Sequence, residues 1–203
     1  MGVRQPDVPT NRVPAWDNGH MSINAVEGGA LQHVIVVGGT VAEWSSLPDD
    51  LWVTRLAEMG KVADHAGACW LTIRPFGAAS GDSAQPHSEL SEQSTTVGNC
   101  HVVAQPAADG RTRLAAAVAE LQAQGQPITE STIGAILNAP AAVDPDLVVV
   151  VGGKSRLPRS LVWELAYSEL VFVDTSWQHF APAHLEEALG SFAHRHRRFG
   201  GID

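Results

Sequence analysis

The chain has 203 residues, of which 44% are hydrophobic, and it carries a formal net charge of −9. This length suits one domain with a substantial core, and the acidic balance argues against general nucleic-acid binding, which needs a basic surface. No apolar run approaches the roughly 18 residues of a transmembrane helix and no secretory signal begins the chain, so we expect a soluble, cytoplasmic protein.

The N-terminal part of the chain differs in composition from the rest. Residues 1–30 are rich in Pro, Gly, Asn and Asp without periodicity, so we expect a mobile arm before a single domain at 31–203. The apolar run at 33–38 predicts the first strand, which ends at two glycines. Pro48 and the acids after it predict the start of a helix that continues to about residue 65.

The remainder alternates between strand and helix patterns. Residues 77–99 interrupt the alternation because they are small and polar, and they predict a long surface loop. The pattern predicts an α/β fold, with a mainly parallel central sheet of about five to six strands flanked by helices. The further expected strands are 68–76, 100–105, 146–153 and 169–174, and the further expected helices are 109–124, 129–138, 161–168 and 182–198.

Common catalytic and phosphate-binding motifs are absent from the sequence. It contains no GxxxxGK[ST], GxGxxG, HExxH or GxSxG pattern. Its two cysteines, Cys69 and Cys100, form no CxxC pair, and each adjoins an apolar run. We therefore expect buried free thiols rather than a metal or redox site.

Several stretches together match one family pattern. The segment 146–201 contains "VVGGK", "LVWELAYSELVFVD" and a final "RRFGG". In addition, "LQHVIVVGGTVAEW" (31–44) and "AQPAADGR" (104–111) match a first strand and a later turn of the pattern. These stretches resemble the cis-prenyltransferases, the family of undecaprenyl diphosphate synthase, and the resemblance covers about 33–76 and 100–201. It implies a cis-prenyltransferase-like fold in which the segment that walls the hydrophobic tunnel, here 77–99, is shortened.

The departures from the family pattern fall on its catalytic positions. The resemblance implies an aspartate after the first strand that holds Mg²⁺ and the allylic diphosphate, but this position is Gly39. The arginine that follows it in the pattern is Glu43, the arginine of the fourth strand is Val150, and the acid after Gly-Gly is Lys154. We therefore expect no catalytic residue and no metal ligand of its own, with Arg156 as a residual phosphate contact.

Other family features are retained. The resemblance implies a dimer interface that includes Trp163, Tyr167, Glu169, Phe172 and Trp177. Trp163, Tyr167 and Phe172 also suit a plain core, and Glu169 suits a local cap or pair.

The tail of the chain is retained as well. In the family, an Arg-x-Gly tail reaches across the dimer to the diphosphate of the partner's site. The resemblance therefore implies substrate binding in trans by Arg198 and Gly200, with Arg197 nearby. The order of roles between the two arginines stays open.

These features favour a degenerate member of the family, similar to the non-catalytic Nogo-B receptor type of subunit in heteromeric cis-prenyltransferases. Such a chain would bind no cofactor itself and would stabilise a catalytic homologue that holds Mg²⁺. It would reach isopentenyl diphosphate through that partner's site and contact the membrane only peripherally. Two alternatives stay open: a stand-alone binding protein, and a divergent prenyl diphosphate enzyme with a site rebuilt from Arg156, Arg74, Glu43 and Asp109.

Overall fold

The computed structural model describes residues 31–76, 90–106, 109–152, 157–166 and 168–199. The arm expected at 1–30 therefore lies outside the described residues. Within them, no helix is long and apolar enough to cross a membrane.

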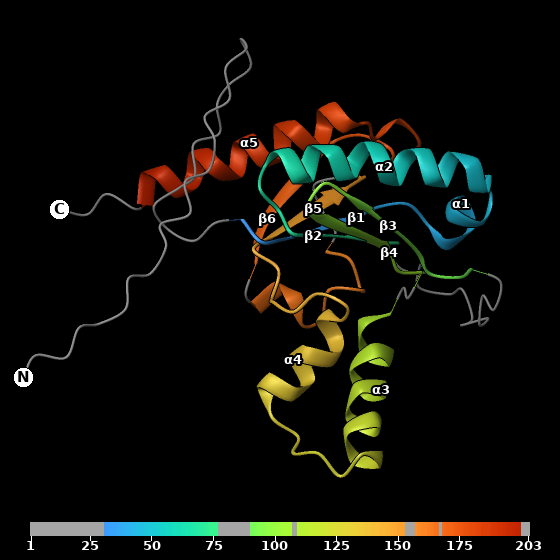
Figure 1. Ribbon diagram of the computed structural model, residues 1–203, viewed down its shortest axis with the longest axis vertical. Coiled ribbons are helices and arrows are strands. Elements are labelled where there is room, and N and C mark those ends of the chain that lie inside the picture. Colours follow the sequence, from blue (N-terminus) through green and yellow to red (C-terminus); the bar gives the residue numbers. More distant parts are fainter. Residues whose placement is uncertain (1–30, 77–89, 107–108, 153–156, 167, 200–203) are drawn as a thin grey trace, which may run out of the picture.

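A six-stranded sheet forms the centre of the molecule, in the order β3-β4-β2-β1-β5-β6 (Figure 1). All neighbouring strands pair in parallel except β3 and β4, which are antiparallel. The expected α/β fold with a mainly parallel sheet is confirmed. The strands are β1 (His33–Val37), β2 (Trp70–Arg74), β3 (Gln93–Val97), β4 (Cys100–Ala104), β5 (Leu147–Val151) and β6 (Glu169–Val173).

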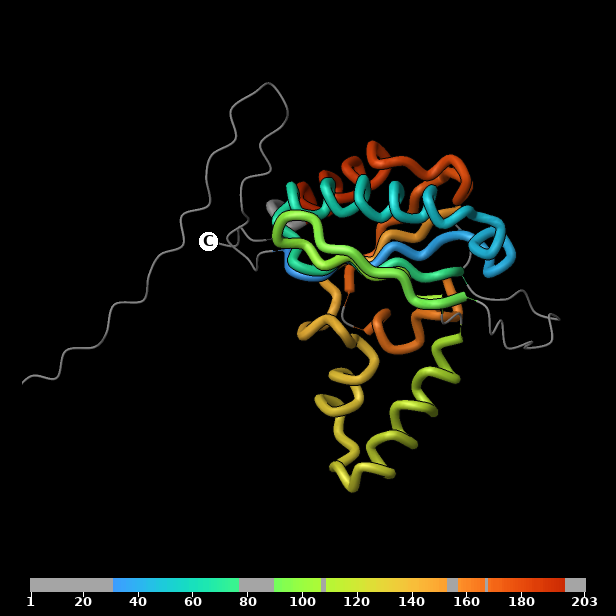
Figure 2. The backbone as a smooth tube through the Cα atoms, turned by 45° about the vertical axis from the view of Figure 1, so that its right-hand side comes forward, coloured from blue at the N-terminus to red at the C-terminus, as the bar shows by residue number. Residues whose placement is uncertain are grey.

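The helices lie on both sides of this sheet. Figures 1 and 2 show α2 and α5 side by side across one face, while α3 and α4 form a hairpin that projects from the other side. The helices are α1 (Val41–Ser45), α2 (Asp49–His65), α3 (Gly110–Ala123), α4 (Glu130–Asn138) and α5 (Pro182–Phe199), with short 3-10 turns η1 (Glu164–Ala166) and η2 (Trp177–His179).

The two central strands, β1 and β5, are buried along their whole length. Because side chains alternate between the faces of a strand, β1 contributes to two apolar clusters. Val34 and Val36 pack with side chains of α2 and α5, whereas Ile35 and Val37 pack with Leu161 on the opposite face. Burial on both faces explains why these strands are continuous apolar runs in the sequence.

Three local expectations need correction. The loop expected at 77–99 contains β3, which pairs with β4 through a two-residue turn at Gly98-Asn99. The helix expected at 161–168 is reduced to η1, where Glu164 turns into the interior and forms ion pairs. Helix α1 was not expected, although Thr40 and Glu43 have the spacing of a capping box and form one here.

Candidate functional site

The turn Gly38-Gly39 follows β1 at the carboxyl end of the sheet. Strand β1 lies between β2 and β5, where the strand order reverses, which is the usual ligand position in open α/β sheets. The Gly38 N–H donates to the carbonyl of Arg74 at 3.0 Å, and the Gly39 carbonyl accepts from the N–H of Phe76 at 2.7 Å. Gly39 has a φ of 73°, a conformation that suits glycine.

The indole of Trp177 covers this turn. A Cβ added at Gly39 would lie 2.6 Å from Cδ1 of Trp177, and one added at Gly38 would lie 2.7 Å from its Cε3. No side chain therefore fits at either glycine while Trp177 keeps this position. The position at which the resemblance implies an aspartate is closed by an indole.

Several contacts hold Trp177 in place. Its ring stacks on Trp44, with centroids 5.8 Å apart, and on Phe180 at 6.2 Å. The guanidinium of Arg55 lies 4.4 Å from the indole centroid and donates to the carbonyls of Trp177 and Phe180 at 2.7 and 3.0 Å. Trp44 in turn donates through Nε1 to the carbonyl of Gly38 at 2.9 Å. The turn and its aromatic cover are thus one packed unit.

Glu43, at the family's arginine position, serves a local purpose. Its Oε2 accepts from the N–H of Thr40 at 2.7 Å, and its own N–H donates to Thr40 Oγ1 at 3.1 Å. These bonds form the capping box at the start of α1. Val150, at the other arginine position, is fully buried in β5. Neither residue supplies a cation to the turn.

The residues at the turn do not fit a Mg²⁺–diphosphate site. Such a site needs carboxylate oxygens for the metal and cations for the phosphates. The turn instead presents two glycines and an indole. In the part of the chain that the structure describes, no three His, Cys, Asp or Glu side chains gather as metal ligands would.

A buried ionic cluster lies beneath the carboxyl end of the sheet. Arg74, the last residue of β2, pairs with Glu164 of η1, and both side chains are 0% exposed. Arg113 of α3 donates through Nη1 to the same oxygen, Glu164 Oε1, at 2.9 Å. Arg74 also donates to Gln105 Oε1 and to the carbonyl of Leu137. The cluster therefore ties the α3–α4 hairpin to the sheet.

The charges in this cluster depend on one another. The pKa of Arg74 is lowered to about 10, mainly because of burial and also because of the nearby Arg113, while Glu164 acts to raise it. Burial acts to raise the pKa of Glu164, but the two arginines outweigh this effect and hold the pKa below its usual value. Arg74 and Glu164 are accordingly both charged at neutral pH.

Glu164 was not singled out from the sequence as a functional or structural residue. The available signal was an acid inside the otherwise apolar stretch 161–166. Such an acid needs a buried cation, and the arginine that ends β2 was a candidate partner. Their pairing depends on a contact 90 residues apart in sequence, which periodicity does not reveal.

The three described residues of the rebuilt-site alternative, Arg74, Glu43 and Asp109, each serve a separate structural role. Arg74 is enclosed in the ionic cluster, and Glu43 caps α1. Asp109 caps α3, where its Oδ1 accepts from the N–H groups of Arg111 and Thr112 at 2.9 and 3.1 Å. Arg156 and Lys154 lie outside the described residues.

The residues expected at a dimer interface differ in how far they are buried. Trp177 packs in the chain's own core at 3% exposure, and its interface role stays a prediction. Phe172 is 36% exposed on β6, an edge strand, and Glu169 is half-buried on the same strand. Trp163 is half-buried, and Tyr167 lies outside the described residues.

The contacts expected of the C-terminal tail with the partner's diphosphate remain predictions. Helix α5 continues to Phe199, so Arg197 and Arg198 belong to its last turn, but their side chains are outside the description. Gly200 lies beyond the described residues.

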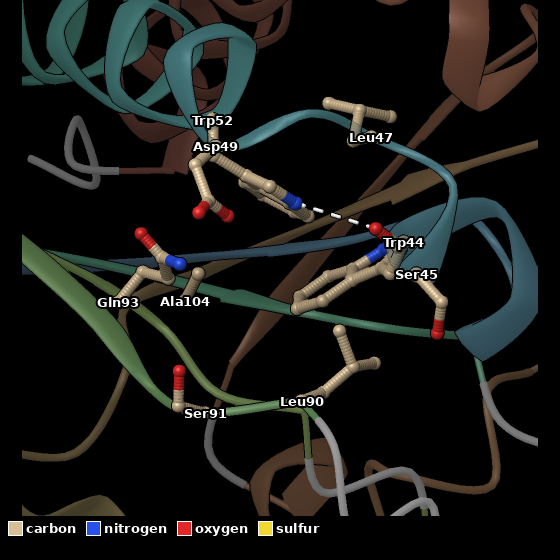
Figure 3. Close-up of a pocket in the computed structure, with 9 residues that line it drawn as sticks. All are labelled: Trp44, Ser45, Leu47, Asp49, Trp52, Leu90, Ser91, Gln93 and Ala104. Carbon is tan, nitrogen blue, oxygen red and sulfur yellow. Dashed lines mark hydrogen bonds between the residues drawn. The ribbon is translucent and has the colours of Figure 1, made fainter.

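A small cavity of about 210 Å³ lies beside the aromatic cover (Figure 3). Small-molecule sites usually have volumes of roughly 300–1,000 Å³, so this cavity is small for an isoprenoid chain. Among the described residues that line it, the one charged residue is Asp49, a carboxylate that would repel a diphosphate. Figure 3 shows the rings of Trp44 and Trp52 on one side and Gln93 and Leu90 on another.

Comparison with known proteins identifies one family to which this chain is similar. The family model described as putative undecaprenyl diphosphate synthase matches residues 72–200. Isoprenyl transferase 2 of Bradyrhizobium diazoefficiens is 48% identical over 90 residues, which are 44% of this chain and 36% of that protein. The isoprenyl transferase of Chromobacterium violaceum is 42% identical over 121 residues, 56% of this chain and 48% of that protein. The matches thus span less than half the length of these relatives.

Solved structures agree on the fold. Lavandulyl diphosphate synthase from Lavandula x intermedia, in complex with dimethylallyl diphosphate, superposes with a TM-score of 0.55 at 17% identity, covering 81% of this chain and 95% of that chain. A probable undecaprenyl diphosphate synthase from Campylobacter jejuni gives 0.56 at 15% identity, covering 81% and 96%. Because the family model matches more than half of the residues and the fold agrees, this chain belongs to the undecaprenyl diphosphate synthase family.

Proposed function

We propose that this chain is a non-catalytic subunit of a heteromeric cis-prenyltransferase, which stabilises a catalytic homologue during polyprenyl diphosphate synthesis. The observation that carries the proposal is the closure of the Gly38-Gly39 turn by Trp177. A chain of this family whose metal–diphosphate position holds an indole needs another subunit for the chemistry.

Two further features support a loss of independent catalysis. The arginine positions of the family are a capping glutamate and a buried valine, Glu43 and Val150, so neither position supplies a cation for phosphate. The cavity beside the turn is small and carries Asp49. At about 0.8 kcal/mol per buried CH₂, a long isoprenoid without an apolar tunnel would forfeit much of its binding free energy.

The contribution to the partner is proposed to come from the C-terminal end. Arg198 of the Arg-x-Gly tail would donate forked hydrogen bonds to the diphosphate of isopentenyl diphosphate in the partner's site, where Mg²⁺ is bound. The exposed Phe172 on edge strand β6 would lie in the shared interface. One charged contact of this kind is worth roughly ten- to a hundredfold in rate if it forms mainly in the transition state.

The test is co-expression with a catalytic homologue from the same source, with incorporation of radiolabelled isopentenyl diphosphate as the activity. Co-purification of the two chains measures pairing separately from activity. Arg198→Ala is expected to leave pairing intact and to lower the rate. Arg111→Ala is the matched control, because this arginine is exposed on α3 and distant in sequence from the tail.

The outcomes separate the hypotheses. Product formation by this chain alone would reject the subunit proposal and favour the divergent enzyme. The subunit proposal would also be rejected if the catalytic homologue together with this chain is no more active than the homologue alone. If pairing raises activity but Arg198→Ala and Arg197→Ala both leave the rate unchanged, the subunit role stands and the tail contact is wrong.

A further inference from the structure

The two edge strands of the sheet, β3 and β6, differ in character. Strand β3 consists of Gln, Ser and Thr residues before a final valine, and its side chains are half-buried or exposed. Strand β6 instead has an uninterrupted apolar run from Leu170 to Val173, in which Phe172 is 36% exposed. A free edge presents unpaired N–H and C=O groups, and an apolar edge readily pairs with a strand of another chain. Such pairing is therefore the greater hazard at β6.

The backbone groups of Leu170 and Phe172 point away from the sheet. The N–H of Glu169 and the carbonyl of Val173 bond to the chain at the two ends of β5, at 3.0 and 3.2 Å. Successive residues of a strand direct their backbone groups to alternate sides, so the residues at even positions between these two face outward. Leu170 and Phe172 therefore supply the groups with which an added strand would form hydrogen bonds.

Arg195 of α5 already occupies one of these outward groups. Its Nη1 donates to the Leu170 carbonyl at 3.2 Å. Helix α5 packs against β6 (Figure 1), and the exposed Arg195 near its C-terminal end reaches the edge of the strand itself. An added strand would need the Leu170 carbonyl as an acceptor, so it would have to displace the guanidinium. Arg195 thus fills a position of the ladder that pairing with another chain requires.

The strand that best fits this edge is β6 of a second copy of the chain. Antiparallel pairing of two β6 strands about Val171 places Leu170 opposite Phe172 and Glu169 opposite Val173. The outward backbone groups of Leu170 then bond to those of Phe172 in the other copy. No like charges of the two strands meet, and aliphatic–aromatic cross-strand pairs are stabilising. The contact is the same on both copies, so it closes as a dimer.

We propose that Arg195 blocks the free edge of β6 and so prevents two copies of this chain from pairing through that strand. The hydrogen bond to the Leu170 carbonyl and the charge placed at the edge both oppose an added strand. This inference does not rest on the proposed subunit role, because it concerns the backbone edge of the isolated chain. The proposed function uses the Phe172 side chain and the tail, and it is tested by activity rather than by self-association.

The experiment is sedimentation equilibrium of the full chain over a range of concentrations, which measures the Kd of self-association. We expect Arg195→Ala to lower this Kd at least about tenfold, because it frees the edge of β6. Arg111→Ala is the matched control, since it removes the same charge from an exposed position on α3 and should leave the Kd unchanged. An unchanged Kd for Arg195→Ala overturns the proposal, as does an equal decrease for Arg111→Ala.

A second substitution in the Arg195→Ala chain tests whether association uses the backbone edge. Phe172→Pro removes an outward N–H but no bond to β5, so it should restore the Kd of the unmodified chain. Phe172→Ala removes the ring and keeps this N–H, so it should restore the Kd only in part, and equal restoration by both rejects the proposal. Circular dichroism checks each fold. If the proline variant does not fold, Arg195→Lys decides, because lysine can still donate to the Leu170 carbonyl. A Kd for Arg195→Lys as low as that for Arg195→Ala rejects the proposal.

Discussion

The Trp177 indole lies so close to Gly39 that an added Cβ would be 2.6 Å from Trp177 Cδ1. This contact joins the end of the first strand to the C-terminal third of the chain. It places an aromatic side chain where the family pattern has an aspartate, and the same contact makes a measurable prediction about stability.

We expect Gly39→Ala to destabilise the fold by about 2–4 kcal/mol, because the new Cβ adds a clash with Trp177 to the cost of a positive φ. Gly125→Ala is the matched control, since Gly125 has a φ of 65° but nothing within 4 Å of an added Cβ. It should lose only about 1–2 kcal/mol. Urea unfolding measures both, and equal losses would show that the clash with Trp177 is relieved at little cost.

The second prediction concerns the buried ion pairs of Glu164. Glu164→Gln is expected to cost about 3–5 kcal/mol of unfolding free energy, because it leaves the fully buried Arg74 without a counter-charge. Glu187→Gln, an exposed control, should change stability by less than about 0.5 kcal/mol. Chemical denaturation at neutral pH measures the loss of unfolding free energy in both variants. An equally small loss in both would mean that Arg74 does not depend on Glu164 for its stabilisation.

The third prediction is a pH dependence that arises from His33. Its Nδ1 donates to the Val143 carbonyl, so Nε2 accepts from the Thr72 hydroxyl in a neutral ring. Burial lowers its pKa from 6.5 to about 4, an effect that the hydrogen bond to Val143 opposes.

The unfolded chain therefore binds the proton first as the pH falls, and stability decreases between about pH 6.5 and pH 4. The loss due to this residue is on the order of 3 kcal/mol. Urea unfolding of the unmodified chain and of His33→Gln from pH 8 to pH 4 isolates the contribution. The difference in stability between them should shrink toward pH 4, and a constant difference would contradict the prediction.

The fourth prediction concerns the reactivity of the two thiols. Both cysteines are free, as expected, but Cys69 is half-buried while Cys100 is fully buried. Burial, with smaller effects of Asp64 and Cys69, raises the pKa of Cys100 to about 12. Because the thiolate is the reactive form, iodoacetamide at pH 8 should label Cys69 first. Cys100 should react only after unfolding, and mass spectrometry of peptides from the native protein would reveal early labelling that contradicts this order.

Much of the architecture was readable from local patterns. The continuous apolar runs of β1 and β5 predicted buried strands, because both faces of a central parallel strand are covered. Helix α2 begins after Pro48 with two acids in its first turn, as the sequence signals predicted. The matches in 146–201 predicted the family, which the family model over 72–200 confirms.

The edge strand β3 was missed for a physical reason. Its residues, Gln93–Val97, are polar enough to suit a loop, and their burial alternates only between half-buried and exposed. Strand formation there depends on pairing with β4 and on the turn at Gly98, where the carboxylate of Asp64 on α2 accepts from the Asn99 N–H at 2.8 Å. Because β4 and Asp64 are not part of the sequence pattern of residues 93–97, that pattern does not predict the strand.

The sequence by itself determined the buried strands β1 and β5, the helix α2, the family, and the absence of an aspartate and an arginine at Gly39 and Glu43. Only the tertiary structure decided what fills the resulting space and where the buried charges pair. Trp177 reaches Gly39 from far along the chain, and Glu164 reaches Arg74 across 90 residues. Packing and ion pairing are interactions between residues distant in sequence, whereas periodicity and capping signals report only on neighbours along the chain.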